Sequence, residues 1–122
     1  MKLHHYRTRI EWTGNRGEGT TGYTAYDRAY TVSAYGKPDI EGSADPAFRG
    51  DASRWNPEEF LLAGLSACHK LWYLHLCAVN GVTVMAYEDE SEAVMDETAG
   101  RFVSARLKPR VMVSAGSDVE KA

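Results

Sequence analysis

The sequence predicts an α+β domain in which one long helix packs on antiparallel sheet. Three observations lead to this prediction: strand-like segments open the chain, a capped apolar helix occupies its middle, and strand-like segments follow. A chain of 122 residues has the length of one domain, so we expect residues 1–122 to form a single domain.

The segments before the helix alternate strands and turns. Residues 2–12 alternate polar with β-branched or aromatic side chains and end in a glycine-rich turn at 13–19. Residues 20–35 are rich in Tyr, Thr and Val and predict one or two more strands. Residues 36–54 contain Gly, Pro, Asp and Ser throughout and predict a long loop, which in a small domain is more often functional than accidental. Four tyrosines are interpreted as strand and core aromatics: Tyr23, Tyr26, Tyr30 and Tyr35.

The helix has start and stop signals in the sequence. Asn56 is a favoured N-cap, Pro57 suits the first helical position, and Glu59 completes a capping box. The helix is predicted to run to about Asn80, where Gly81 offers a left-handed stop. Its first half is apolar all round, so we expect protein to surround it.

Three strands are predicted after the helix, at 82–87, 91–97 and 101–114. A second capping box at 117–120 then announces a helix, but too few residues follow to form one. From this pattern we expect either that the chain is a truncated form of a longer protein or that its last element is missing for some other reason.

Composition excludes several classes of partner. The net charge is −3 and no long basic run is present, which argues against nucleic acid as the main partner. The N-terminus lacks the apolar core of a signal peptide, and the longest apolar run, residues 60–68, is too short to span a bilayer. We therefore expect a cytoplasmic protein with no membrane partner.

Cys68 is the residue whose role the pattern leaves open. It lies on the helix face with the smallest side chains, where a packing role and a reactive role are equally compatible with the sequence. Cys77 falls on the opposite side of the helix and about 13 Å along it, so the two thiols cannot pair within one chain and Cys77 is interpreted as a packing residue. The spacings among Cys68, His69, His75 and Cys77 include no pair three or four apart, so we expect no metal, and no cofactor is indicated.

The stretch NPEEFLLAGLSACHK at 56–70 resembles the helix signature of the OsmC/Ohr family, the osmotically inducible and organic hydroperoxide resistance proteins. WTGNRGEGT at 12–20 resembles the first hairpin of that family, SADPAFRGD at 43–51 its loop before the helix, and VSAGSDVEKA at 113–122 the approach to its last helix. The resemblance covers nearly the whole chain, and the helix motif is its most specific part.

The resemblance implies an intertwined homodimer and a thiol-dependent peroxidase that reduces organic hydroperoxides, an antioxidant enzyme of the oxidative stress response. Carried over by motif, Cys68 is the peroxidatic thiol, Arg16 is the cation that stabilises its thiolate, and Glu58 orients the arginine. Five side chains would form the hydrocarbon walls of the substrate site: Phe48, Trp55, Phe60, Leu61 and Leu65.

The chain departs from the family at its end. It lacks the family's final helix and strand, and with them the second cysteine that condenses with the sulfenic acid. The resemblance therefore implies that an external thiol or dithiol reduces Cys68. The alternative from the sequence is a non-enzymatic dimeric domain of the same fold that binds a small hydrophobic ligand, with Cys68 a structural residue.

Overall fold

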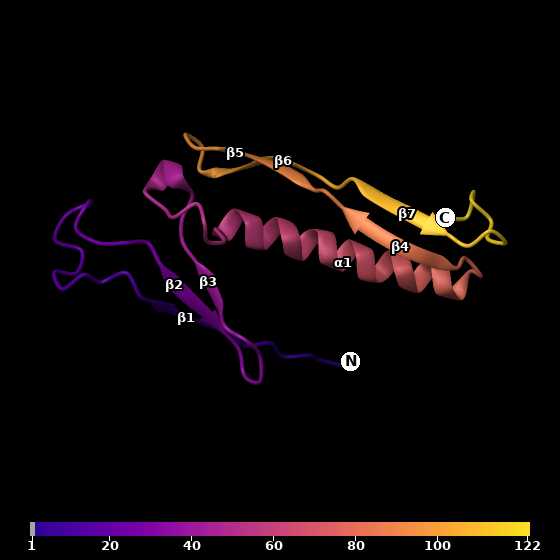
Figure 1. Ribbon diagram of the computed structural model, residues 1–122, viewed down its shortest axis with the longest axis horizontal. Coiled ribbons are helices and arrows are strands. Elements are labelled where there is room, and N and C mark those ends of the chain that lie inside the picture. Colours follow the sequence, from indigo (N-terminus) through magenta and orange to yellow (C-terminus); the bar gives the residue numbers. More distant parts are fainter. Residues whose placement is uncertain (1) are drawn as a thin grey trace. The chain divides into compact units, whose positions relative to one another are not determined.

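The computed structural model describes residues 2–122, which divide into two compact units (Figure 1). The first unit ends at Phe60, and the second spans Leu61–Ala122. The helix α1 (Pro57–Val79) begins in the first unit and belongs mostly to the second. One long helix and antiparallel strand pairs make up the regular structure, so the predicted α+β class is confirmed.

The first unit is built on an antiparallel sheet of three short strands in the order β1 (Arg9–Trp12), β2 (Tyr30–Ser33) and β3 (Ile40–Gly42). Tyr30 stands opposite Gly42 in the β2–β3 pair, and a Cβ on this glycine would lie 2.5 Å from the Tyr30 ring. Glycine at position 42 therefore lets the Tyr30 side chain lie flat against the neighbouring strand.

A short 3₁₀ helix, η1 (Pro46–Phe48), leads from the sheet toward α1. The Ser43 amide donates to the Trp55 carbonyl at 2.8 Å, and the buried Ser43 hydroxyl accepts from the Asp51 amide at 3.0 Å. These bonds bring the residue before Asn56 back against the end of β3, which fixes where α1 begins.

The start of α1 has the predicted capping box. The Asn56 side-chain oxygen accepts from the Glu59 amide at 2.8 Å, and the Glu59 carboxylate accepts from the Asn56 amide at 3.0 Å. The two bonds satisfy amides that have no partner inside the helix, which is worth about 1 kcal/mol for the N-cap. Gly81, at φ 76°, follows the other end as expected.

The second unit places two antiparallel strand pairs after the helix. β4 pairs with β7 and β5 with β6, so the chain runs out along one strand of each pair and returns along the other. Figure 1 shows the β4–β7 pair running beside α1. The strands are β4 (Val84–Asp89), β5 (Glu92–Asp96), β6 (Arg101–Arg106) and β7 (Pro109–Val113).

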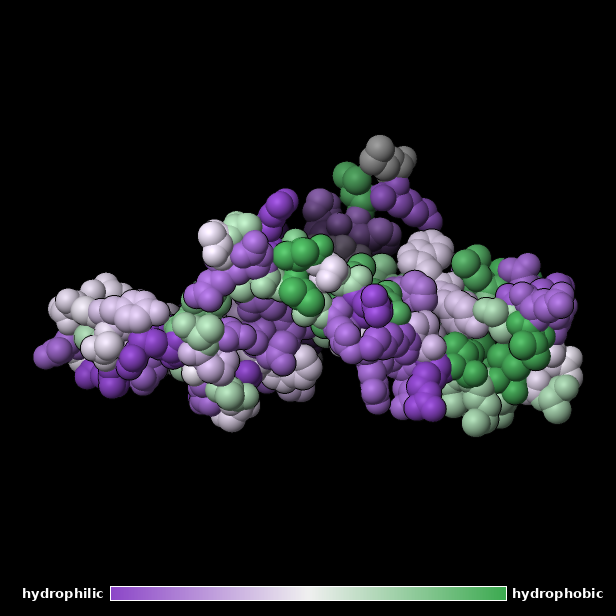
Figure 2. Space-filling view, turned by 90° about the horizontal axis from the view of Figure 1, so that it is seen from above, coloured by the Kyte–Doolittle hydropathy of each residue, from purple (hydrophilic) through white to green (hydrophobic). Residues whose placement is uncertain are grey.

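Few hydrophobic side chains are fully buried. Among residues 2–122 the buried hydrophobic residues are Cys77 and Val82, and many large apolar side chains reach the surface. Figure 2 shows such side chains, in green, gathered toward the end of the second unit where α1 ends and β4 begins. The expectation that protein surrounds the first half of α1 is wrong for the single chain, because Leu61 and Leu65 are 61% and 50% exposed.

Several predicted strand boundaries are corrected. Regular pairing begins only at Arg9 in the first predicted strand, and 20–35 contributes only β2 because turns fill the segment before it. The predicted loop at 36–54 contains β3 and η1. The predicted strand at 101–114 is two strands, because the chain turns at residues 107–108 to pair β7 with β4.

The interpretation of the four tyrosines is corrected too. Tyr30 lies in β2, but Tyr23 is 62% exposed and Tyr35 is fully exposed, so neither belongs to a core. The last residues, 117–122, form turns, with the Lys121 amide donating to the Asp118 carbonyl at 3.2 Å. In the part of the chain that is described, no helix combines the length and apolar character needed to cross a bilayer.

Candidate functional site

Cys68 lies in the second unit on a continuous apolar face of α1. Its thiol is free and exposed. Exposed apolar residues precede and follow it at spacings of three and four, which places them on one side of the helix. We call this surface the Cys68 face, and it consists of Leu61, Leu65, Cys68, Trp72, Leu76 and Val79.

Cys77 has the opposite environment. It is 5% exposed and free, and its hydrogen bond and charge contribute, after burial, to raising the pKa of the Tyr73 phenol. Tyr73 also packs against Tyr87 of β4, with ring centroids 5.8 Å apart. Burial of Cys77 fits the packing role expected from the sequence.

Glu58 lies in the first turn of α1, and one of its carboxylate oxygens is left without a partner. Oε2 is buried and accepts no hydrogen bond from any residue in 2–122. The Tyr30 phenol lies close enough that the Glu58 charge, after burial itself, raises the Tyr30 pKa. A buried carboxylate oxygen without a donor is costly, so this oxygen is a vacant acceptor for a cation or a hydroxyl.

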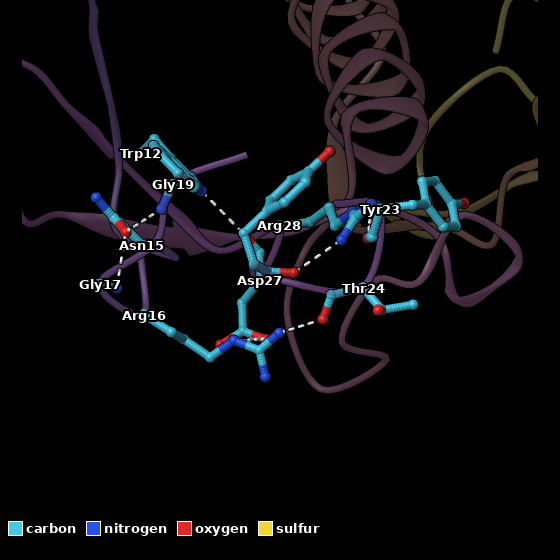
Figure 3. Close-up of polar contacts among 10 residues, drawn as sticks. Trp12, Asn15, Arg16, Gly17, Gly19, Tyr23, Thr24, Asp27 and Arg28 are labelled. Carbon is cyan, nitrogen blue, oxygen red and sulfur yellow. Dashed lines mark hydrogen bonds and ion pairs between the residues drawn. The ribbon is translucent and has the colours of Figure 1, made fainter. Parts of the chain in front are cut away.

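Arg16 lies in the loop between β1 and β2, and its contacts are local (Figure 3). Its Nη2 donates to the Thr24 carbonyl, and its Nε lies 3.9 Å from the Asp27 carboxylate. The side chain remains 52% exposed. An exposed ion pair such as Arg16–Asp27 is weak in water, so it holds the Arg16 guanidinium only loosely.

The structure therefore does not join Arg16 to Glu58, although both belong to the first unit. No hydrogen bond or ion pair links them within the described residues, and each has different surroundings. Cys68 belongs to the second unit, ten residues after Glu58 along α1. The contact of Arg16 with Cys68 stays a prediction.

The predicted hydrocarbon walls divide between the units. Phe60 packs on Trp55 in the first unit, with ring centroids 5.8 Å apart, and Phe48 is half-buried in η1. Leu61 and Leu65 are on the Cys68 face of the second unit. Each group is apolar and partly open, which is what a site for an alkyl chain requires.

Sequence reasoning missed a polar cluster centred on Asp89, at the end of β4. The Asp89 carboxylate accepts from the Ser66 hydroxyl of α1 at 2.5 Å, the Ser91 hydroxyl at 3.1 Å and the Lys108 amide at 2.6 Å. The Ser66 bond is the main reason that the Asp89 pKa is lowered from 3.8. No sequence spacing signals this cluster, because its members come from α1, from the end of β4 with the connection that follows it, and from the β6–β7 connection.

A second polar contact missed from the sequence lies one turn along α1 from Ser66. The His69 ring nitrogen Nδ1 lies 3.2 Å from the Tyr87 hydroxyl, and the His69 ring stacks on Tyr73. His69 is therefore directed toward β4, whereas the adjacent Cys68 is exposed on its own face. Among residues 2–122 no group of three His, Cys, Asp or Glu side chains is arranged to hold a metal ion.

Sequence reasoning also missed Arg28, because the tyrosines nearby were interpreted as core residues. The Arg28 guanidinium lies 3.9 Å from the Tyr26 ring centroid and 4.7 Å from that of Tyr23. It also donates to the backbone carbonyls of both tyrosines at 2.8 Å. The sequence signal that could have indicated this contact is Arg28 two positions after Tyr26, with Tyr23 close by.

The fold and the site together define an α+β protein with an exposed cysteine in the middle of its long helix. The sequence profile of the OsmC-like protein family matches residues 50–122, which is more than half of the chain. The chain belongs to the OsmC-like family.

A solved structure supports this assignment. An OsmC-like protein of unknown function from Vibrio cholerae superimposes with a TM-score of 0.81 and 26% sequence identity. The match covers 95% of this chain and 79% of the other. No curated protein matches the sequence.

Proposed function

We propose that this protein is a thiol-dependent peroxidase that reduces organic hydroperoxides to alcohols through Cys68. The observation that carries the proposal is a free, exposed thiol in the middle of an apolar helix face, in a chain of the OsmC-like family. Access is needed for a peroxide to reach the sulfur, and an apolar surround favours an alkyl peroxide over hydrogen peroxide.

The proposed reaction has two stages. The Cys68 thiolate attacks the distal peroxide oxygen, a sulfur–oxygen bond forms, the oxygen–oxygen bond breaks, and the alkoxide takes a proton and leaves as the alcohol. The sulfur is oxidised by two electrons to a sulfenic acid. An external thiol then attacks that sulfur and releases water, and a second thiol cleaves the mixed disulfide and restores Cys68.

Arg16 and Glu58 have supporting roles in this proposal. Arg16 stabilises the Cys68 thiolate, and Glu58 orients the guanidinium. Two features support the pairing: Glu58 Oε2 is a buried acceptor that no residue in 2–122 occupies, and Arg16 is half-exposed with one weak ion pair. In the assembled site Glu58 Oε2 would accept from the Arg16 guanidinium, in addition to the Thr24 and Asp27 contacts that Arg16 already makes.

The same proposal includes a homodimer, a cytoplasmic location and a substrate site. The Cys68 face is an apolar surface, and a second copy of the chain that packs on its large side chains while leaving the Cys68 thiol open to substrate would bury those side chains. The walls of the substrate site are Phe48, Trp55, Phe60, Leu61 and Leu65. A reducing compartment supplies the external thiol that the second stage needs.

Trapping of the sulfenic acid tests the first stage. The protein is treated with one equivalent of cumene hydroperoxide in the presence of dimedone, and its intact mass is measured. We expect rapid addition of one dimedone, slower addition with hydrogen peroxide, and none in Cys68→Ser. The matched control is Cys77→Ser, which removes the other thiol and should keep the adduct.

A folded protein that forms no adduct with either peroxide would contradict the proposal. The apolar surface around Cys68 would then favour a non-enzymatic domain that binds a hydrophobic ligand. Circular dichroism of each variant distinguishes loss of chemistry from loss of fold.

The Arg16→Ala variant tests the proposed cation. We expect the thiolate fraction of Cys68 to fall, because a nearby positive charge favours the thiolate, and peroxide reduction at neutral pH to slow by up to about tenfold for each unit by which the measured pKa rises. The pH dependence of alkylation by iodoacetamide measures the pKa, with Cys77→Ser as background. The control is Arg9→Ala, since Arg9 pairs with Glu11 on the same strand. An unchanged pKa and rate would remove Arg16 from the mechanism.

A further inference from the structure

The loop that carries Arg16 is closed at its base by the β1–β2 hairpin. The Thr13 amide donates to the Ala29 carbonyl and the Asp27 amide to the Gly14 carbonyl, each at 2.9 Å, which extends the strand pairing into the loop. The Trp12 indole donates to the Asp27 carbonyl at 2.8 Å. The residues between Gly14 and Asp27 are therefore held at both ends.

Two arginines occupy this loop in different ways (Figure 3). Arg28 is partly buried, and its two terminal nitrogens donate to the carbonyls of Tyr26 and Tyr23 while both rings lie against its guanidinium. Arg16 has one carbonyl and one carboxylate at 3.9 Å, and about half of its side chain is exposed. The first arrangement engages both terminal nitrogens and two aromatic rings, whereas the second has one hydrogen bond and one weak ion pair.

The two arginines share one short segment of backbone. Arg28 holds the carbonyls of Tyr23 and Tyr26, and Arg16 binds the carbonyl of Thr24, which lies between them in sequence. Two fixed carbonyls on either side leave the Thr24 peptide little freedom to rotate. The Ala25 amide of the same peptide also donates to the Gly22 carbonyl at 3.0 Å, so the direction of the Thr24 carbonyl depends on this turn and on the Arg28 clamp together.

We propose that Arg28 is the positioning residue for Arg16: by clamping the carbonyls of Tyr23 and Tyr26, it holds the Thr24 carbonyl as the seat of the Arg16 guanidinium. Arg28 acts only through the backbone and does not itself contact the reacting atoms. The consequence for the thiol rests on the proposed function, whereas the positioning of Arg16 does not.

The first test measures Arg16 directly. In ¹⁵N NMR the Nε–H group of Arg16 gives a heteronuclear NOE that reports its motion. We expect this NOE to fall in Arg28→Lys and in Arg28→Ala, since a lysine keeps the charge but cannot bridge two carbonyls with a planar fork. Tyr23→Phe keeps the ring and the carbonyl, and Arg9→Ala removes an arginine of β1, so both should leave the NOE unchanged. An Arg16 NOE that is the same in Arg28→Lys and the unmodified protein would overturn the proposal.

The second test separates positioning from function. The pKa of Cys68 is measured from the pH profile of alkylation in Arg28→Lys, Arg16→Ala and the double variant. If Arg28 acts through Arg16, Arg28→Lys raises the pKa of Cys68 and slows alkylation at neutral pH several-fold, and the double variant goes no further than Arg16→Ala.

The outcomes distinguish the two proposals. A Cys68 pKa that moves in Arg16→Ala but not in Arg28→Lys overturns the positioning role and leaves the peroxidase proposal standing. A pKa that moves in neither variant argues against Arg16 in the peroxidase mechanism, and the NOE then decides the positioning role alone. Additive shifts in the double variant would mean that Arg28 acts on the thiol independently, which also overturns the proposal.

Discussion

At the scale of single residues, Gly14 shows how closely the loop base is packed. It is buried, and a Cβ at this position would lie 1.9 Å from the Asp27 carbonyl oxygen and 2.8 Å from the Trp12 indole nitrogen. Real Cβ contacts are never that short, and the nearest obstacle is backbone, so a side chain would have to open the hairpin. The loop that carries Arg16 therefore depends on a residue that has no side chain.

The Gly14→Ala variant should lower the free energy of unfolding by about 1–3 kcal/mol, the usual cost of forcing extra atoms into a packed site. Urea denaturation followed by circular dichroism measures this change. Gly22→Ala in the same loop is the control, because the nearest atom to its Cβ would be Ala25 Cβ at an ordinary 4.0 Å. Equal stabilities of the two variants would show that the hairpin relaxes around the added methyl group.

Residue identity alone gave part of the candidate site. Cys68, Arg16 and Glu58 could be proposed because each lies in a short motif of the family. Arg28 could not, because its role comes from backbone carbonyls that are directed toward it only once the loop has folded. The lack of a hydrogen-bond partner for Glu58 Oε2 could not be predicted from the sequence either, since burial of one carboxylate atom depends on the whole first unit.

At the scale of elements, the Asp89 cluster joins α1 to the β4–β5 connection and to the β6–β7 connection. Its hydrogen bonds, the one from Ser66 first, lower the Asp89 pKa below 3.8. The unfolded chain therefore takes up the proton at a higher pH than the folded chain does. Stability from this cluster is complete above the ordinary aspartate pKa and is lost as the pH falls through the lower folded value.

The Ser66→Ala variant should reduce this dependence. We expect the urea midpoint of the unmodified protein to drop as the pH falls from about 5 through the ordinary aspartate range and below it, and the variant to be less stable at pH 7 but to lose less over the same interval. Asp51 and Glu92 also have lowered pKa values, so the comparison uses the difference between the two proteins. Parallel pH curves would mean that the Ser66 bond contributes nothing to the titration.

The elements differ in how far the sequence specified them. α1 was predicted almost to the residue because its signals are local: an N-cap, a capping box and a glycine stop. β3 was missed because three residues beside Gly, Pro and Asp carry little local preference, and its pairing with β2 is a tertiary contact. The same reason explains the division of residues 101–114, where the partner strand decides the break.

At the scale of the whole molecule, few hydrophobic residues are buried, and the Cys68 face is an apolar surface that stays exposed as a result. Its apolar side chains recur along α1 from Leu61 to Val79, and Trp72 alone is 64% exposed. A surface of this kind is unusual on a protein that stays monomeric. We therefore expect it to be covered by a second copy of the chain.

Light scattering after size-exclusion chromatography tests this expectation. The unmodified protein should have the mass of a dimer, and Trp72→Asp should shift it toward the monomer, because a carboxylate cannot be buried without a partner. Tyr35→Asp is the control, since Tyr35 is fully exposed and lies outside α1. A dimer that persists in Trp72→Asp would place the contact on another surface.

The two cysteines differ in exposure, so the rates at which a thiol reagent labels them can report local opening of the second unit. Cys68 is exposed in the single chain, whereas Cys77 is buried and can react only when the second unit opens locally. The ratio of the two labelling rates, corrected for the intrinsic reactivity of each thiol, then reads out how often the second unit opens. A ligand, oxidation of Cys68 or a second copy of the chain that stabilises this unit against opening will slow the labelling of Cys77. The buried thiol therefore detects a change at Cys68 without reacting there itself.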